Sequence, residues 1–145
     1  MKKYQKISLV LFRVLMGWMF FYAGITKVLN PKWSAAGYLK GAHTFVGFYH
    51  WLASPKLLPF VNFANEWGLT LLGVSLILGI FIRYSAPLGA VLMFLYYFVI
   101  LQFPHPNVNS FLVDEHVLYS AGLFVLAAFR ADTVWSLAEK YPKLK

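Results

Sequence analysis

Cysteine is absent from this sequence of 145 residues, and charged residues make up only 12% of it. Without cysteine, the chain itself carries no disulfide, no cysteine-ligated iron–sulfur cluster, no thiolate zinc site and no catalytic thiol. Acidic residues are also few: five, against thirteen lysines and arginines, which gives a net charge of +8. Hydrophobic residues make up 60% of the chain, whereas an ordinary soluble domain has about 45–50% apolar residues and about 25% charged residues.

A soluble fold of this length buries only about two-thirds of the surface of its unfolded chain, too little to hide so many apolar residues. The composition therefore excludes a typical soluble enzyme, a disordered tail and a nucleic-acid-binding module. The excess of basic residues suits the head groups of anionic lipids and the rules of membrane topology. We therefore expect an integral membrane protein whose main partner is the lipid bilayer.

Four apolar stretches approach the length of about 20 helical residues that crosses a hydrocarbon core of about 30 Å. They cover residues 7–29, 60–82, 84–103 and 111–130. The first is too long for a signal peptide and is interrupted by Arg13, so we expect it to remain in the mature protein. The fourth crosses the membrane only if it begins near residue 111, which places Asp114, Glu115 and His116 in its first turns.

These stretches predict an all-α fold: an integral membrane four-helix bundle forming a single domain over residues 1–145, with no repeat and no dividing linker. In the first external connection, residues 42–53 mix aromatic and polar side chains. That mixture favours a short helix at the outer membrane interface, although an irregular loop packed on the bundle is an open alternative. Residues 131–144 predict a second short helix, on the cytoplasmic side.

Lysine and arginine are unevenly divided between the two sides of this bundle. If the N-terminus is inside, the cytoplasmic segments hold eight of them: Lys2, Lys3, Lys6, Arg83, Arg130, Lys140, Lys143 and Lys145. The external segments hold four: Lys27, Lys32, Lys40 and Lys56. This excess of positive charge inside predicts a multi-pass protein with both termini in the cytoplasm.

Ionisable side chains within the apolar stretches need a partner or a purpose, because their insertion costs several kcal/mol. Arg13, Gly17, Phe20, Gly24 and Lys27 follow one another in steps of three and four, so they share one helical face. The glycines allow a neighbouring helix to approach closely. Both cations are also near enough to a membrane surface to extend toward it, so structural anchoring stays open for each.

The second stretch carries Glu66, the only acid deep inside an apolar span. Lys27 reaches a similar depth from the other direction, so the two predict an ion pair that serves either function or helix locking. In the fourth stretch, His116 and Tyr119 lie on one face, and His116 can pass protons near neutral pH. Asp114 fits the cap of the helix that follows it better than a chemical role.

The sequence gives little indication of a metal site or of a nucleotide-binding site. Three histidines and a glutamate (His43, His50, His116 and Glu66) fall on the outer side. They lack a tight ligand motif such as H-E-x-x-H, so we expect no metal. The sequence also has no glycine-rich phosphate loop, and its serine, histidine and acidic residues do not predict a nucleophile triad.

Two segments resemble motifs of the DoxX/DoxD family. Residues 13–31 read RVLMGWMFFYAGITKVLNP, and residues 66–73 read EWGLTLLG. The sequence Asp114-Glu115-His116 at the head of the last predicted helix also fits. The resemblance covers nearly the whole chain and is greatest to the DoxD members, the small membrane subunits of thiosulfate:quinone oxidoreductases.

The resemblance implies a four-helix protein of the prokaryotic cytoplasmic (inner) membrane. It further implies an oxidoreductase that passes electrons from thiosulfate to membrane quinone and yields tetrathionate, together with a second subunit. Quinone is then the expected cofactor or substrate, and a homo-oligomer stays open. Two other functions remain: a non-enzymatic membrane scaffold or assembly protein, and a small-solute carrier, against which the lack of an inverted repeat counts.

A quinone head group needs hydrogen-bond donors at two carbonyls, a proton source and an apolar slot. We expect Glu66, His116 and Lys27 to be the catalytic residues, with Glu66 as proton relay. For binding of the quinone we expect Lys27, Tyr119, Trp67 and Arg13, with Trp33 as an alternative apolar wall. Because no cysteine is present, any intermediate electron carrier must be bound or belong to the partner subunit.

Overall fold

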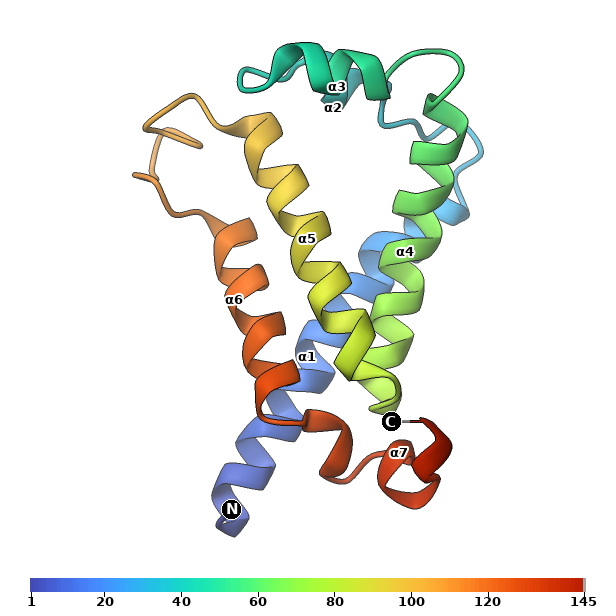
Figure 1. Cartoon of the computed structure of the whole chain (residues 1–145), viewed down its shortest axis with the longest axis vertical. Coiled ribbons are helices and arrows are strands. Elements are labelled where there is room, and N and C mark those ends of the chain that lie inside the picture. The colour runs from blue at the N-terminus through green and yellow to red at the C-terminus, as the bar shows by residue number, and fades with distance from the viewer. Residues whose placement is uncertain (145) are drawn as a thin grey trace.

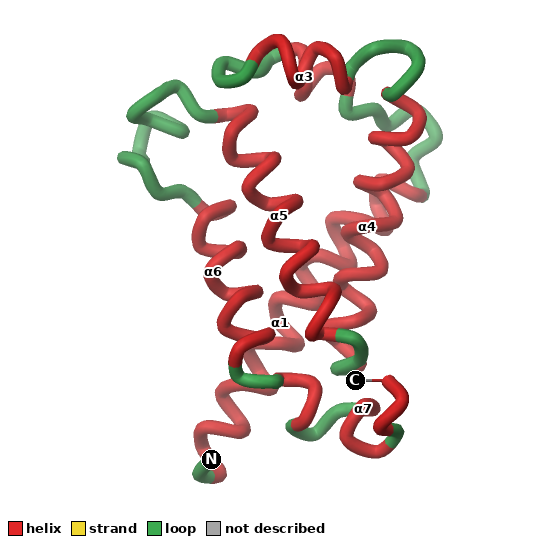
Figure 2. The backbone as a smooth tube through the Cα atoms, in the orientation of Figure 1, coloured by secondary structure: helices red, strands yellow, loops and turns green. Residues whose placement is uncertain are grey.

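The computed structural model describes residues 1–144, whose regular secondary structure is helical, with two isolated bridges in the connection over residues 101–114 (Figures 1 and 2). The four longest helices are α1 (Lys3–Val28), α4 (Leu58–Leu78), α5 (Ile82–Ile100) and α6 (Glu115–Ala128). The short elements are α2 (Ala36–Lys40), α3 (Val46–Leu52), α7 (Leu137–Lys140) and two 3₁₀ turns (Ala131–Thr133 and Pro142–Leu144). The all-α prediction is confirmed.

Three of these helices, α1, α4 and α5, are long and apolar enough to cross a membrane. The predicted fourth span, residues 111–130, is longer than the helix that forms there. Helix α6 has 14 residues, about 21 Å at 1.5 Å per residue. It begins only at Glu115 because Asp114 caps it: the Asp114 carboxylate accepts hydrogen bonds from the backbone N–H groups of His116 and Val117. The predicted capping role of Asp114 is thus confirmed.

The joint between α4 and α5 lies a few residues before its predicted place. Helix α4 ends at Gly79, whose φ of +70° is a left-handed conformation that glycine adopts without strain. Helix α5 starts at Ile82, so Arg83 belongs to its first turn rather than to the connection. The two helices form an antiparallel hairpin.

Helices α1 and α4 cross with their backbones in contact, as the glycines on α1 predicted. A Cβ atom added to Gly24 would lie 2.3 Å from the backbone N of Thr70, and one added to Gly73 would lie 2.3 Å from the backbone N of Phe21. At Gly17 an added Cβ would lie 2.9 Å from the backbone N of Ile77. Only glycine fits such distances, so these residues set the α1–α4 crossing.

Helices α2 and α3 lie across one end of the bundle, and both chain termini lie toward the other end (Figure 1). Helix α3 falls within the stretch 42–53 where a short helix was predicted. The predicted helix over residues 131–144 is divided into a 3₁₀ turn, α7 and a second 3₁₀ turn. Lys145, one of the cytoplasmic lysines of the charge count, lies outside the described residues.

Candidate functional site

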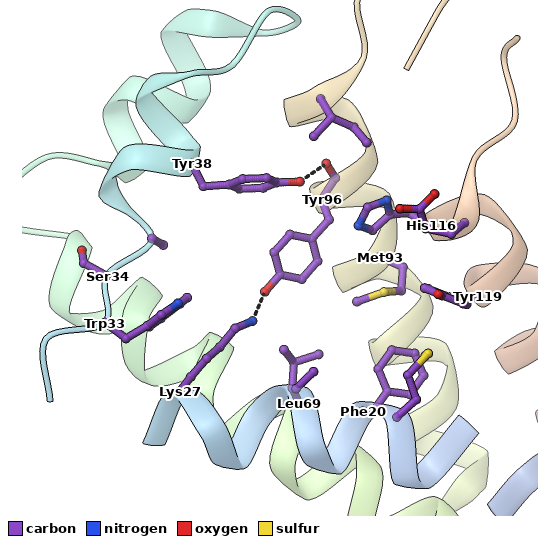
Figure 3. A pocket seen from close by; sticks show the side chains of 15 residues that line it. Phe20, Lys27, Trp33, Ser34, Tyr38, Leu69, Met93, Tyr96, His116 and Tyr119 are labelled. Carbon is purple, nitrogen blue, oxygen red and sulfur yellow. Dashed lines mark hydrogen bonds between the residues drawn. The ribbon is translucent and has the colours of Figure 1, made fainter. Parts of the chain in front are cut away.

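A cavity of about 540 Å³ lies among α1, α4, α5, α6 and the segment that leads into α2 (Figure 3). Most of its wall is apolar, including the side chains of Phe20, Leu69 and Met93. Four elements bring polar groups to it: Lys27 from α1, Tyr38 from α2, Tyr96 from α5, and Glu115, His116 and Tyr119 from α6. An apolar cavity of this size with a few converging polar groups is the usual form of a small-molecule site.

Lys27 is held in this cavity by aromatic residues. Its Nζ donates a hydrogen bond of 3.2 Å to the hydroxyl of Tyr96. The same ammonium lies 5.0 Å from the ring centroid of Trp33 and 5.4 Å from that of Tyr96, within cation–π range. The Tyr96 hydroxyl in turn donates to Oδ1 of Asn65 on α4. A hydrogen-bonded chain therefore runs from α1 through α5 to α4.

Tyr38 fixes the upper wall of the cavity. Its hydroxyl donates a hydrogen bond of 3.0 Å to the backbone carbonyl of Tyr96, and the two rings pack edge to face with centroids 5.6 Å apart (Figure 3). Burial raises the pKa of the Tyr38 hydroxyl, and the neighbouring Tyr96 raises it further. Tyr38 therefore stays protonated and acts as a fixed donor.

On the opposite side, His116 is oriented by Asp114. Nδ1 of His116 lies 2.6 Å from Oδ2 of Asp114, whose side chain is fully buried. A carboxylate only accepts hydrogen bonds, so it keeps the proton on Nδ1 and leaves Nε2 free for a ligand. The His116 ring lies near the rings of Tyr96 and Tyr119, with centroid distances of 5.8 Å and 6.4 Å.

Asp114, Glu115 and His116 are also the group of potential metal ligands found in the described part of the chain, with ligand atoms within 4.8 Å of one another. The carboxylate of Asp114 is already engaged three times, by the imidazole and by the two backbone N–H groups that it caps. These contacts explain the cluster without an ion. Its chemistry is that of a hydrogen-bonded carboxylate–imidazole pair.

The structure brings together Lys27, His116 and Tyr119 from the predicted set, with Trp33 as a wall. Glu66 is not among the residues that line the cavity, and the predicted direct Lys27–Glu66 ion pair does not form. Among residues 1–144, the ion pairs are His116–Asp114 and Arg130–Asp132. Lys27 finds a tyrosine hydroxyl instead.

Two residues that were predicted to bind the quinone lie elsewhere. Trp67 is 40% exposed on the outer surface of α4, where its ring packs near Phe63. Arg13 is 2% exposed at the other end of the bundle. Neither residue lines this cavity, because Trp67 lies on a different face of α4 from Leu69, and Arg13 lies almost four turns before Lys27 on α1.

Arg13 instead holds the C-terminal segment against the bundle. One terminal nitrogen donates to the backbone carbonyls of Ala131 and Val134, at 2.5 and 2.9 Å, and the other donates to that of Trp135 at 3.0 Å. Of the two roles left open for Arg13, this is the structural one. Its partners are carbonyls of a segment more than a hundred residues away.

Sequence reasoning missed two residues that line the cavity, Tyr96 and Tyr38, and also Asn65, which accepts the hydrogen bond of Tyr96. Tyr96 sits within an apolar run, where its ring looks like ordinary core. Its hydroxyl could have indicated a role in the site, because a buried tyrosine hydroxyl needs a hydrogen-bond partner. Asn65 directly precedes Glu66 and is 8% exposed, whereas Glu66 is half-buried, so the α4 residue that accepts from Tyr96 is the buried amide rather than the acid.

Comparison with protein families matches residues 8–102 to DoxX. The matched range runs from α1 to the end of α5 and includes Lys27, Asn65 and Tyr96, whereas α6 with His116 lies beyond it. No curated protein and no solved structure matches the chain. The family match covers well over half of the sequence, and together with the apolar helices it identifies a membrane protein. The chain belongs to the DoxX family.

Proposed function

We propose that this chain is the quinone-binding membrane subunit of an oxidoreductase and that the cavity between α1, α5 and α6 holds the quinone head group. One observation carries the proposal: an ammonium group, an imidazole and tyrosine hydroxyls converge from several helices on a mostly apolar cavity of about 540 Å³. A quinone has the complementary form, a flat apolar ring with one oxygen acceptor at each end.

The hydrogen bonds leave donors free for such a ligand. Lys27 has three N–H groups and directs one to Tyr96, so others remain for a quinone oxygen. His116 has its Nδ1 proton engaged by Asp114, and its free Nε2 can exchange a proton with the ligand. The two residues lie on different sides of the cavity (Figure 3). Each is therefore assigned to one end of the quinone.

Reduction of a quinone to a quinol takes up two electrons and two protons. The protein supplies protons through His116 and stabilises negative charge on oxygen through Lys27. The chain has no cysteine to hold an iron–sulfur cluster, so the electrons reach the quinone through a bound carrier or through a partner subunit. The proposal includes such a second subunit, as in the DoxD-type enzymes that the chain resembles. The resemblance to DoxD proteins supports thiosulfate as donor: two thiosulfate ions lose one electron each and join as tetrathionate.

We assign the end that carries α2 and α3 to the outer side of a prokaryotic cytoplasmic membrane. Both termini lie toward the opposite end, and the basic residues of that end support a cytoplasmic location. The cavity then opens near the outer surface. A quinone entering from the bilayer meets Lys27 and His116 at that depth.

The first experiment measures bound quinone. Purified protein is extracted with organic solvent, and the extract is analysed for quinone by its oxidised-minus-reduced absorbance. The same protein is then titrated with a short-chain quinone in the presence of the partner subunit or an artificial donor. We expect His116→Ala and Lys27→Met each to lower quinone reduction about 100-fold, the usual effect of losing a general acid or base.

His43→Ala is the matched control, because His43 is exposed and is not among the residues lining this cavity. It should leave turnover unchanged. Glu66→Gln tests the predicted proton relay, and since Glu66 does not line the cavity we expect a smaller loss than for His116→Ala. Full activity in folded His116→Ala and Lys27→Met would refute the quinone site and favour the scaffold function.

A further inference from the structure

A second cavity, of about 610 Å³, lies between α4 and α5 and shares no lining residue with the first. The two helices meet at their joint and diverge away from it (Figure 1). Ala64, Gly68 and Ser75 of α4 and Ser85 and Leu88 of α5 are among the residues that line the resulting groove. The proposed quinone site makes no use of it.

Gly68 is what hollows this groove. A Cβ atom added there would meet nothing within 4 Å, whereas one added to Gly24 or Gly73 would collide with backbone. Gly68 is therefore not needed for a contact between helices of this chain. A glycine inside a helix destabilises it by about 0.5–1 kcal/mol relative to alanine. Its effect here is to leave open space along the α4–α5 groove.

The groove has the length and polarity of a lipid chain. Along α4 it extends from Ala64 to Ser75, about 16 Å of helix, and one leaflet of the hydrocarbon core is about 15 Å deep. Its only hydroxyls are already paired: Ser75 bonds to Ser85 at 2.6 Å and donates to the carbonyl of Ile80. Leu71 and Leu88 form its rim and are 59% and 70% exposed, so the groove opens to the surface.

Positive charge stands at the end of the groove nearest the helix joint. Phe81 lines that end, and exposed Arg83 lies in the first turn of α5, with its guanidinium 5.8 Å from the ring centroid of Tyr84. The backbone N–H of Phe81 donates a hydrogen bond of 2.8 Å to the carbonyl of Leu144, which brings exposed Lys143 to the same end. Of the two acids in the C-terminal segment, Asp132 is buried and paired with Arg130, and exposed Glu139 is followed directly by exposed Lys140. Arg83 and Lys143 therefore leave an excess of positive charge at this end.

We propose that the α4–α5 groove binds one acyl chain of an anionic phospholipid, with the phosphate held at Arg83 and Lys143. The apolar groove accounts for the chain, and the two cations account for the preference in head group. The site stabilises the diverging part of the α4–α5 hairpin by filling the space between its helices.

Native mass spectrometry of the purified full-length protein tests this site. The protein is incubated in mild detergent with equal amounts of phosphatidylglycerol and phosphatidylcholine that carry the same acyl chains. A lysine or arginine near an anionic head group contributes about fivefold in affinity. We expect one tightly bound phosphatidylglycerol, and Arg83→Gln should lower the preference for it about fivefold. Lys56→Gln, the same loss of charge at the other end of the molecule, should not change it.

Gly68→Leu fills the groove and should abolish the binding of this one lipid, while circular dichroism shows an unchanged helix content. Three results would overturn the proposal. The first is equal binding of both lipids by the wild-type protein. The second is retention of the bound phosphatidylglycerol by Gly68→Leu. The third is a wild-type dimer that Gly68→Leu converts to monomers, which would identify a second copy of the chain as the occupant.

Discussion

Replacing Gly24 with alanine is the sharpest test of the α1–α4 crossing. The added Cβ would lie 2.3 Å from the backbone N, 2.4 Å from Oγ1 and 2.8 Å from Cα of Thr70. Carbon atoms prefer contacts of about 3.5 Å or more, so the two helices must separate by about 1 Å. The obstacle is backbone, which has no rotamer to change. Lys27, less than one turn farther along α1, moves with its helix.

The size of the effect follows from two opposing terms. Forcing an extra methyl group into a packed contact costs typically about 1–3 kcal/mol. Alanine regains about 1 kcal/mol of helix propensity over glycine. We therefore expect Gly24→Ala to lower the free energy of unfolding by up to about 2 kcal/mol. Gly68→Ala is the matched control on α4, because a Cβ atom added there would meet nothing within 4 Å. This variant should raise the free energy of unfolding by about 0.5–1 kcal/mol.

Reversible unfolding by sodium dodecyl sulfate in mixed micelles, followed by circular dichroism, measures both variants against the unchanged protein. The predicted sign differs between them, so an error common to all samples cannot imitate the result. If Gly24→Ala proved as stable as Gly68→Ala, the close backbone contact between α1 and α4 would be refuted.

Two further predictions concern the anchoring of the C-terminal segment and the orientation of the chain in the membrane. Arg13→Leu removes the donors to the three carbonyls of Ala131, Val134 and Trp135, and buried polar groups without partners cost about 1–3 kcal/mol each. Limited proteolysis should then cut the C-terminal segment at least tenfold faster than in the wild type, and unchanged cleavage would contradict the anchoring role. The absence of cysteine permits a topology test: Val108→Cys should react with an impermeant maleimide in intact spheroplasts, whereas Lys143→Cys should react only after lysis. Labelling of Lys143→Cys in intact spheroplasts would reverse the assigned orientation.

The sequence predicted those features that depend on local periodicity. Gly17, Gly24 and Lys27 share a face because helical spacing alone puts them there, and the structure turns that face toward α4 and the cavity. The cap at Asp114 is equally local, because its carboxylate accepts hydrogen bonds from backbone N–H groups only two and three residues later. These contacts do not depend on the rest of the fold.

The partners of the membrane charges were not local, and the partner predicted for Lys27 was wrong. The cost of burying Lys27 and Arg13 requires that each find a partner, but it does not say which one. Glu66 was chosen for Lys27 because it was the only acid at a suitable depth. The structure satisfies Lys27 with a tyrosine 69 residues away, and Arg13 with backbone carbonyls, which every residue carries and no sequence pattern distinguishes.

The shortened α6 and the carboxylate–imidazole pair are one feature. Asp114 caps α6 only because the helix starts at Glu115, and its φ of −123° is an extended conformation that a residue inside a helix does not adopt. A helix starting near residue 111, as predicted, would give the N–H groups of His116 and Val117 helical partners and would leave Asp114 without its role as cap. The carboxylate that begins the helix is also the one that orients the ring of His116. The start of α6 therefore determines both how far the helix reaches into the membrane and which imidazole nitrogen faces the cavity.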